Sequence, residues 1–205
     1  MIRYFCFLLV FSFLASSCKP HPSAIRIGDQ IWMNENLSSD HFRNGDEIQQ
    51  AKTAEEWLLL TKERKPAWCY PMDNADNGIS YGKLYNWFAV ADPRGIAPKG
   101  WHVPRDEEWT QLTDYYGGEV MAAYQLRTTG LSNDKQNETG FSGRAAGARR
   151  INGTFFDFGA NAYWWTATES NKEIAWTRQL NYSRCVVNSL TVPKKAGLSV
   201  RCIKD

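Results

Sequence analysis

The sequence has no strong excess of charge of either sign. Its 205 residues include 24 Lys or Arg and 22 Asp or Glu, which gives a net charge of +2 at pH 7. A protein with this balance lacks a general surface for polyanions, so we expect no nucleic acid among its partners. After Ala15 the chain also lacks any run that approaches the roughly 20 apolar residues of a membrane-spanning helix.

The residue patterns that bind metals or cofactors are also missing. The 3 histidines, His21, His41 and His102, stand in no metal-ligand spacing, and no CxxC motif occurs. Residues 71–78 (PMDNADNG) carry oxygen-bearing side chains, but they lack the spacing and the closing glutamate of a calcium loop. The stretch 143–147 lacks the spacing of a phosphate-binding loop. The sequence therefore predicts neither a metal ion nor a cofactor.

The N-terminus carries a targeting signal. Arg3 precedes an apolar run from Phe5 to Ala15, which is about half of a membrane span and is typical of a signal peptide. The small residues before Cys18 resemble a bacterial lipobox, in which the cysteine is acylated and becomes the new N-terminus. The alternative is an ordinary secretory signal that is cleaved near Ser17.

These features divide the chain into three parts. We expect a lipoprotein signal peptide over residues 1–17, a Pro-containing tether over 18–24 and a single domain over 25–205. Export would place the domain in the bacterial envelope. A lipid on Cys18, palmitate or a similar acyl chain, would hold it to a membrane, which we expect to be the outer membrane.

The order of the expected elements indicates an α+β fold. Thr53 to Glu56 have capping-box spacing and open a helix over about 54–63, and further helices are expected from Asp106 to the Gly117-Gly118 pair and over 119–127. Short apolar segments follow near the C-terminal end and predict strands at 163–166, 175–178 and 198–202. Early helices followed by late strands favour an antiparallel sheet over a doubly wound parallel one.

Three cysteines remain when Cys6 and Cys18 are set aside. An exported domain that contains Cys69, Cys185 and Cys202 should form one disulfide and keep one thiol. The residues themselves leave all three pairings open.

Several segments together resemble one family of exported bacterial proteins, the Fibrobacter succinogenes major paralogous domain. The resemblance covers residues 25–205 and departs from the family pattern at Ala97-Pro98, where Cys-Pro is frequent, and at Arg105, where Ser or Thr is usual. The segments, in chain order, are QIWMNENL (30–37), AWCY (67–70), YGKLYNW (81–87), GWHVP (100–104), EW (108–109), GG (117–118), GFS (140–142), WWTATE (164–169) and SVRC (199–202).

The resemblance implies a fold related to C-type lectin-like domains, with two or three early helices and an antiparallel sheet. It also implies a disulfide between Cys69 and Cys202, with Cys185–Cys202 as the rival pairing. The segment around Trp101 is similar to formylglycine-generating enzymes, which share this broad fold and bind copper with two late cysteines. Because no second cysteine lies near Cys185 except Cys202 in the final segment, we expect the chain not to be an enzyme.

A binding module is the function that we expect from the sequence. The loop-rich stretch 128–161 is polar and could contact a glycan, a peptide or a protein, whereas His102 is expected to support the core. The alternatives are an unrecognised enzyme of the formylglycine-generating type and a structural envelope protein. The candidate ligand-binding residues are Asn133, Asp134, Asn137, Glu138, Arg149, Arg150 and Glu169.

Overall fold

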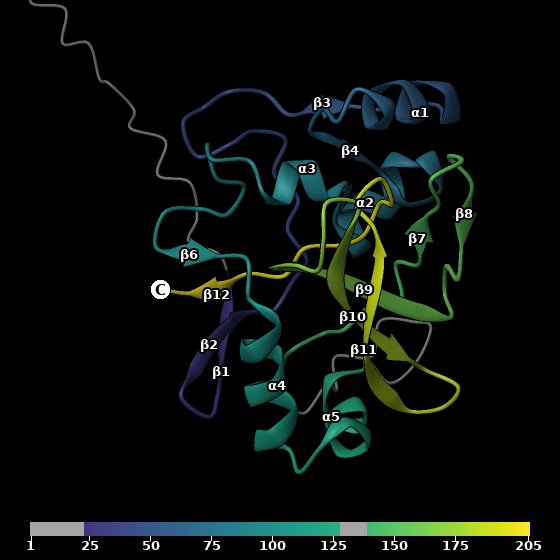
Figure 1. Ribbon diagram of the computed structural model, residues 1–205. Coiled ribbons are helices and arrows are strands. Elements are labelled where there is room, and N and C mark those ends of the chain that lie inside the picture. The colour runs from purple at the N-terminus through teal and green to yellow at the C-terminus, as the bar shows by residue number, and fades with distance from the viewer. Residues whose placement is uncertain (1–22, 128–138) are drawn as a thin grey trace, which may run out of the picture.

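The computed structural model describes residues 23–127 and 139–205. Within these ranges the chain forms five α-helices and twelve short strands, so the fold is α+β (Figure 1). The helices are α1 (Ala54–Lys62), α2 (Ala75–Tyr81), α3 (Trp87–Val90), α4 (Asp106–Tyr115) and α5 (Glu119–Leu126), with a 3-10 turn at Pro71–Asp73. The strands are β1 (Ala24–Ile27), β2 (Gln30–Met33), β3 (Gln49–Gln50), β4 (Ala67–Cys69), β5 (Leu84–Tyr85), β6 (Trp101–His102), β7 (Ala148–Arg149), β8 (Phe155–Phe156), β9 (Asn161–Glu169), β10 (Ile174–Asn181), β11 (Val186–Pro193) and β12 (Ile203–Lys204).

Two antiparallel sheets dominate the described part of the fold. The first has the strand order β1-β2-β12-β6, so both ends of the described chain lie in one sheet. The second has the order β11-β10-β9 and contains the longest strands, with Arg178 opposite Trp164. Helices α4 and α5 lie together beside these sheets (Figure 1). A smaller sheet, β3-β4-β5, contains the parallel pair β3–β4, and β7 pairs with β8.

The helices and the first hairpin that the sequence predicts are confirmed. Helices α1, α4 and α5 begin and end within about one residue of the expected bounds. Gly28 adopts a positive φ of 57° in the two-residue turn between β1 and β2. The expected strands around residues 164 and 176 belong to β9 and β10. The segment 198–202 instead makes isolated bridges from Leu198 and Ser199, and β12 begins only at Ile203.

Two short helices were not expected from the sequence. Residues 71–78, which carry oxygen-bearing side chains, contain the start of α2, and α3 follows at Trp87–Val90. An asparagine caps each of them, because Asn74 Oδ1 accepts from Asp76 N–H at 2.9 Å and Asn86 Oδ1 accepts from Ala89 N–H at 3.0 Å. The capping oxygen, rather than helix propensity, starts these short turns.

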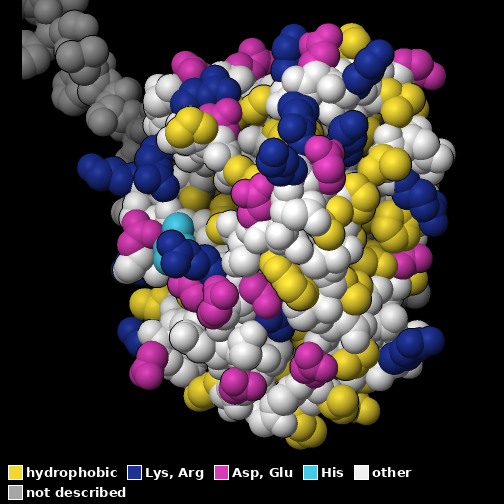
Figure 2. All heavy atoms as spheres, in the orientation of Figure 1, with side chains coloured by type: hydrophobic (Ala, Val, Ile, Leu, Met, Phe, Trp, Pro, Cys, Tyr) yellow, Lys and Arg dark blue, Asp and Glu magenta, His cyan; other side chains and the backbone are white. Residues whose placement is uncertain are grey.

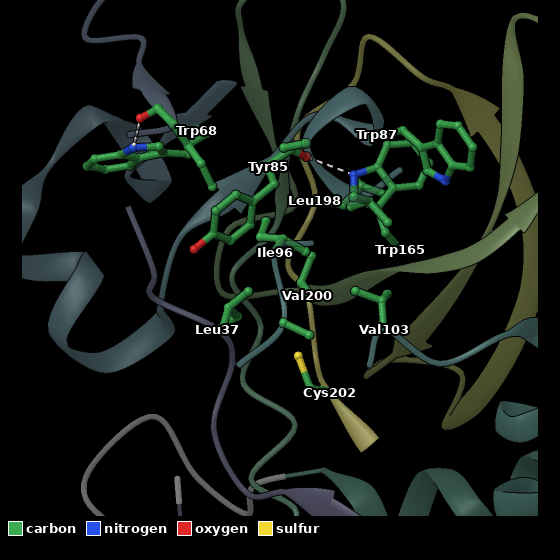
Figure 3. Close-up of a cluster of buried hydrophobic side chains, with 14 of the residues drawn as sticks. Leu37, Trp68, Tyr85, Trp87, Ile96, Val103, Trp165, Leu198, Val200 and Cys202 are labelled. Atoms are coloured by element: carbon green, nitrogen blue, oxygen red, sulfur yellow. Dashed lines mark hydrogen bonds between the residues drawn. The ribbon is translucent and has the colours of Figure 1, made fainter. Parts of the chain in front are cut away.

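Tryptophan side chains fill much of the core. Trp109 of α4 packs against Trp32 with ring centroids 4.8 Å apart and against Trp164 at 5.3 Å. A second cluster surrounds Trp165, whose Nε1 donates to the carbonyl oxygen of Tyr85 at 2.7 Å (Figure 3). Trp101, Trp109, Trp164 and Trp165 are all buried, and the last three have no exposed surface.

The expected disulfide is not present. Cys69, Cys185 and Cys202 are free, buried thiols, and each packs in a different hydrophobic cluster. Figure 3 shows Cys202 among aliphatic side chains such as Val200. Burial raises the pKa of Cys69 and of Cys202 to about 12, so neither thiol ionises near neutral pH. Neither the Cys69–Cys202 pairing nor the Cys185–Cys202 alternative is formed.

Among the described residues, no helix combines the length and the hydropathy that crossing a membrane requires.

Candidate functional site

An open pocket of about 680 Å³ lies between β6, the start of α4 and the segment 90–97. Its volume is in the range that holds small ligands or the end of a chain. In Figure 2 the surface near β6 is hollowed, with hydrophobic side chains inside the hollow and charged side chains around it. We call this hollow the His102 pocket; it is lined by Arg43, Val90, Gly95, Ile96, Ala97, His102, Val103, Arg105, Glu107, Glu108 and Ala167.

Arg43 forms one wall of the His102 pocket. Its Nε donates to the carbonyl oxygen of Ala97 at 3.1 Å, and its Nη2 donates to that of Trp101 at 2.9 Å and of Pro98 at 3.5 Å. These bonds fix the plane of the guanidinium against the segment that builds the pocket. No carboxylate of the described chain lies within ion-pair distance of Arg43, so its positive charge is held in place without a counter-ion.

His102 lies on β6 between two carboxylates. Its Nε2 is 2.9 Å from Glu108 Oε1, and its Nδ1 is 2.8 Å from Asp205 Oδ1. Burial favours the neutral ring, but the hydrogen bonds and charges of the two carboxylates outweigh it and raise the pKa of His102 above 6.5. The imidazole therefore joins β6, α4 and the C-terminal segment, and both of its ring nitrogens are engaged.

The start of α4 also lines the pocket, and other elements cap and hold it. Arg105 at the cap position offers no side-chain oxygen; instead Glu108 accepts from its N–H at 2.7 Å and Thr168 Oγ1 accepts from Asp106 N–H at 2.9 Å. The buried Arg178 of β10 donates from Nε and Nη2 to Asp106, at 2.7 Å each. The Arg105 side chain is left exposed at the pocket edge, without a carboxylate partner in the described chain.

The arrangement is suited to binding. The pocket combines an aliphatic floor from Val90, Ile96 and Val103 with fixed charges at its edge, and no cysteine lines it. The described residues contain no group of three or more His, Cys, Asp or Glu side chains arranged to hold a metal ion. The two carboxylates beside His102 contact opposite ring nitrogens, so they do not converge on one point.

The candidate residues that the sequence suggested do not form this site. Arg149 is fully buried, its guanidinium donates to Asp73 at 2.9 Å, and it lies between the rings of Trp57 and Phe155. It therefore holds the core rather than a ligand, contrary to the expectation. Asn133, Asp134, Asn137 and Glu138 lie outside the described residues, as does Cys18.

The remaining two candidates are exposed but already partnered. Arg150 lies 4.3 Å from the ring of Phe156 and is not among the residues that line the His102 pocket. Glu169 pairs with the buried Lys194 at the end of β9. Sequence reasoning missed Arg43 altogether, because no motif contains it. The departure from the family pattern at Arg105 and the family segments 100–104, 108–109 and 164–169 were the signals that pointed toward the pocket.

A second, smaller hollow of about 40 Å³ lies beside a buried polar node. Asn36 Oδ1 accepts from Trp164 Nε1 at 2.8 Å and from Arg201 Nη2 at 2.6 Å, and Asn36 Nδ2 reaches Ser199 Oγ at 3.3 Å. We call this group the Arg201 node; Arg201 also donates to the carbonyl oxygens of Met33, Phe141 and Ser142.

Comparison with known proteins gives one match. The chain matches the Fibrobacter succinogenes major domain over residues 25–204, which is nearly the whole described region. No curated protein and no solved structure matches significantly. The segments that carry the family pattern include those of the Arg201 node and of β6. The chain is thus a member of the Fibrobacter succinogenes major domain family.

Proposed function

We propose that this protein is a non-catalytic binding module of the bacterial envelope, and that the His102 pocket is its binding site. The observation that carries the proposal is the pocket itself, an open hollow of about 680 Å³ with an aliphatic floor and two arginines for which the described residues supply no ion-pair partner. Fixed charges around an apolar floor are the usual features of a ligand site. The ligand is a glycan, a peptide or a protein segment.

The burial of the thiols favours binding over catalysis. An enzyme of the formylglycine-generating type needs two neighbouring thiolates to hold copper. Cys202 is fully buried with its pKa raised to about 12, and Cys185 packs in another cluster. The described cysteines therefore offer no exposed pair for such chemistry.

The finer fold assignment belongs to the same proposal. A C-type lectin-like arrangement is supported by the sheet in which β1 and β2, from the start of the domain, lie next to β12 from its end. It is further supported by the early pair of helices α4 and α5, which pack beside the late antiparallel strands. An experimental structure of residues 25–205, compared with lectin-like domains, would test this assignment.

Closing the pocket provides the direct test of the binding proposal. Ala167 lines the pocket and is exposed, so Ala167→Trp should fill it without disturbing the core. Ala160, an exposed alanine that does not line the pocket, supplies the matched control Ala160→Trp. Glycan and peptide arrays should show ligands that bind the native chain and Ala160→Trp but not Ala167→Trp. Equal binding by all three proteins would exclude the His102 pocket as the site.

The lipid anchor is a separate part of the proposal and has its own test. It is supported by the apolar run, the small residues before Cys18 and the Pro-containing tether after it. Cys18→Ala should release the protein from the membrane fraction and abolish labelling with a radioactive fatty acid. Unchanged membrane association and unchanged labelling would rule out acylation at Cys18.

A further inference from the structure

We propose that the His102 pocket recognises the C-terminal end of a peptide, with the terminal carboxylate bound by Arg43 and a small aliphatic last side chain on the pocket floor. This inference rests on the proposed function and narrows its ligand to one chemical class. Three features of the described residues carry it: the positive charges that lack partners, the chemistry of the floor and the hydrogen bonds that already engage Glu108.

The positive charge of Arg43 is preorganised for an anion. The carbonyl oxygens of Ala97 and Trp101 engage Nε and Nη2, and no partner for Nη1 is found in the described chain. Because these bonds hold the guanidinium before a ligand arrives, little side-chain freedom is lost on binding. Nη1 keeps its N–H groups for a carboxylate oxygen, with which it can form a charge-assisted hydrogen bond.

Arg105 adds a second charge of the same sign to the pocket lining. Its side chain is exposed at the start of α4, where the helix has its positive end. Two arginines that line one pocket and have no ion-pair partner in the described residues favour a negative group there. Arg105 is free to move toward the ligand, so it should contribute less than Arg43.

One of the two carboxylates that line the pocket is already engaged, and the other, Glu107, keeps its negative charge. Glu108 accepts from His102 at 2.9 Å and from the N–H of Arg105 at 2.7 Å, so its charge is already offset. Glu107 is exposed. It is available to accept hydrogen bonds from the amide N–H groups that precede the terminus of a peptide.

The floor favours an aliphatic side chain over a sugar ring. Val90, Ile96, Ala97 and Val103 are buried residues that line the pocket, together with Ala167. Apart from the imidazole of His102, which is held edge-on by two carboxylates, the lining contains no aromatic ring. Aliphatic carbon without an aromatic face matches the methyl groups of Ala or Val better than the face of a pyranose, which commonly stacks on aromatic rings.

Binding of short synthetic peptides to the purified full chain tests the proposal. The probe is a fluorescein-labelled peptide that ends in Gly-Ala-Val with a free carboxylate, and it is compared with the same peptide as a C-terminal amide. Fluorescence anisotropy should give at least about tenfold tighter binding for the free acid, since a charge-assisted hydrogen bond is lost with the amide. A free acid that ends in Asp should also bind at least several times more weakly, because the floor is apolar.

The variants assign the effect to the pocket. Arg43→Gln should weaken binding of the free acid about tenfold and remove the preference over the amide, whereas Arg105→Gln should cost a few-fold. Arg26→Gln, which removes an exposed arginine on β1, is the matched control and should change nothing. Thermal unfolding of each variant should match that of the native chain, so that lost binding is not lost folding.

The outcomes separate this inference from the proposed function. If the acid and the amide bind equally and Ala167→Trp abolishes both, the pocket is the site but it does not recognise a terminal carboxylate. If an oligouronate binds in a way that depends on Arg43 and the peptides do not bind, the ligand carries a carboxylate but is not a peptide. If the peptides bind with the expected preference but Ala167→Trp and Arg43→Gln leave it intact, both the inference and the proposed site are wrong. If neither the peptides nor any arrayed ligand bind, both proposals fail.

Discussion

Arg201 and Arg43 both donate hydrogen bonds to backbone carbonyl oxygens, the first in the core and the second at the pocket. Arg201 directs hydrogen bonds from Nε, Nη1 and Nη2 to Asn36 and to three carbonyl oxygens, and it has no exposed surface. Arg43 also holds backbone carbonyl oxygens, but it does so at the wall of a pocket and keeps donor capacity for a ligand. The comparison distinguishes an arginine whose three nitrogens all donate within the core from an arginine that keeps a nitrogen without a partner in the described residues.

The residues around Arg201 belong to the segments that carry the family pattern. Asn36, Trp164, Ser199 and Arg201 all lie in segments that identify the family, and they contact one another in the core. Arg43 lies in no such segment, and Arg105 departs from the pattern. The family segments also contain His102, Val103, Glu108 and Ala167, which line the pocket, so the pattern covers the core and part of the pocket lining.

The largest expected effect is on the scaffold. Trp109→Ala removes a fully buried ring that packs on Trp32 and Trp164, and it should lower the free energy of unfolding by about 3–5 kcal/mol. Urea denaturation measures the loss. Tyr124→Ala, which removes a half-exposed ring from the neighbouring helix, is the control and should cost about 1 kcal/mol or less. Similar losses for both variants would show that the aromatic cluster is not the centre of the core.

The two arginines themselves provide the next comparison. Arg201→Met keeps the length of the side chain but leaves the carbonyl oxygens of Met33 and Phe141 without this donor, and Asn36 Oδ1 keeps only Trp164 Nε1. It should therefore cost about 3 kcal/mol. Arg43→Gln removes a partly solvated charge and should cost less than about 1 kcal/mol. Denaturation of both variants under one set of conditions decides the point. A larger loss for Arg43→Gln would reverse the roles assigned to the two residues.

A smaller effect is expected from the pH dependence of stability. The folded state raises the pKa of His102, so its contribution is fully present below about pH 6.5 and is lost as the pH rises through the higher folded value. Since the side chain is partly exposed, the contribution should stay below about 1 kcal/mol. His102→Gln should remove this part of the difference in unfolding free energy between pH 5.5 and pH 8.5. An unchanged difference would show that the two carboxylates do not favour the charged ring.

The thiols should have no redox effect on stability. Cys69 and Cys202 are free and buried, so a reducing agent should leave the melting temperature unchanged. The native protein should react with iodoacetamide slowly at these positions and completely after denaturation. A melting temperature that falls with reductant, together with a disulfide-linked peptide containing Cys202, would restore the bond that the sequence suggested.

The parts of the fold that local patterns determine could be predicted from the sequence. The capping residues around Thr53 and the Gly117-Gly118 pair give the bounds of α1 and α4, and the Gly28 turn gives the first hairpin. The order of helices and strands gives the α+β class. Helices α2 and α3 were missed because their stability comes from one asparagine cap each, which is a weak signal within a polar or aromatic segment.

The site could not be predicted because it depends on contacts between distant segments. Arg43 is fixed by carbonyl oxygens of Ala97 and Trp101, more than 50 positions away, and no spacing rule links them. Arg149 shows the opposite error: its loop composition suggested a ligand contact, but Asp73 and two aromatic rings hold it in the interior. Burial and pairing decide whether a charged residue serves the core or a ligand, and neither is visible in a single sequence.

Two measurements on Ala167→Trp distinguish most directly between an effect on binding in the pocket and an effect on the stability of the core. Binding of the free-acid peptide and urea denaturation are measured on this variant, on Ala160→Trp and on the native chain. We predict that Ala167→Trp loses peptide binding while its free energy of unfolding stays within about 1 kcal/mol of the native value, and that Ala160→Trp changes neither. Native-level binding by a folded Ala167→Trp protein would contradict the assignment of the His102 pocket as the binding site.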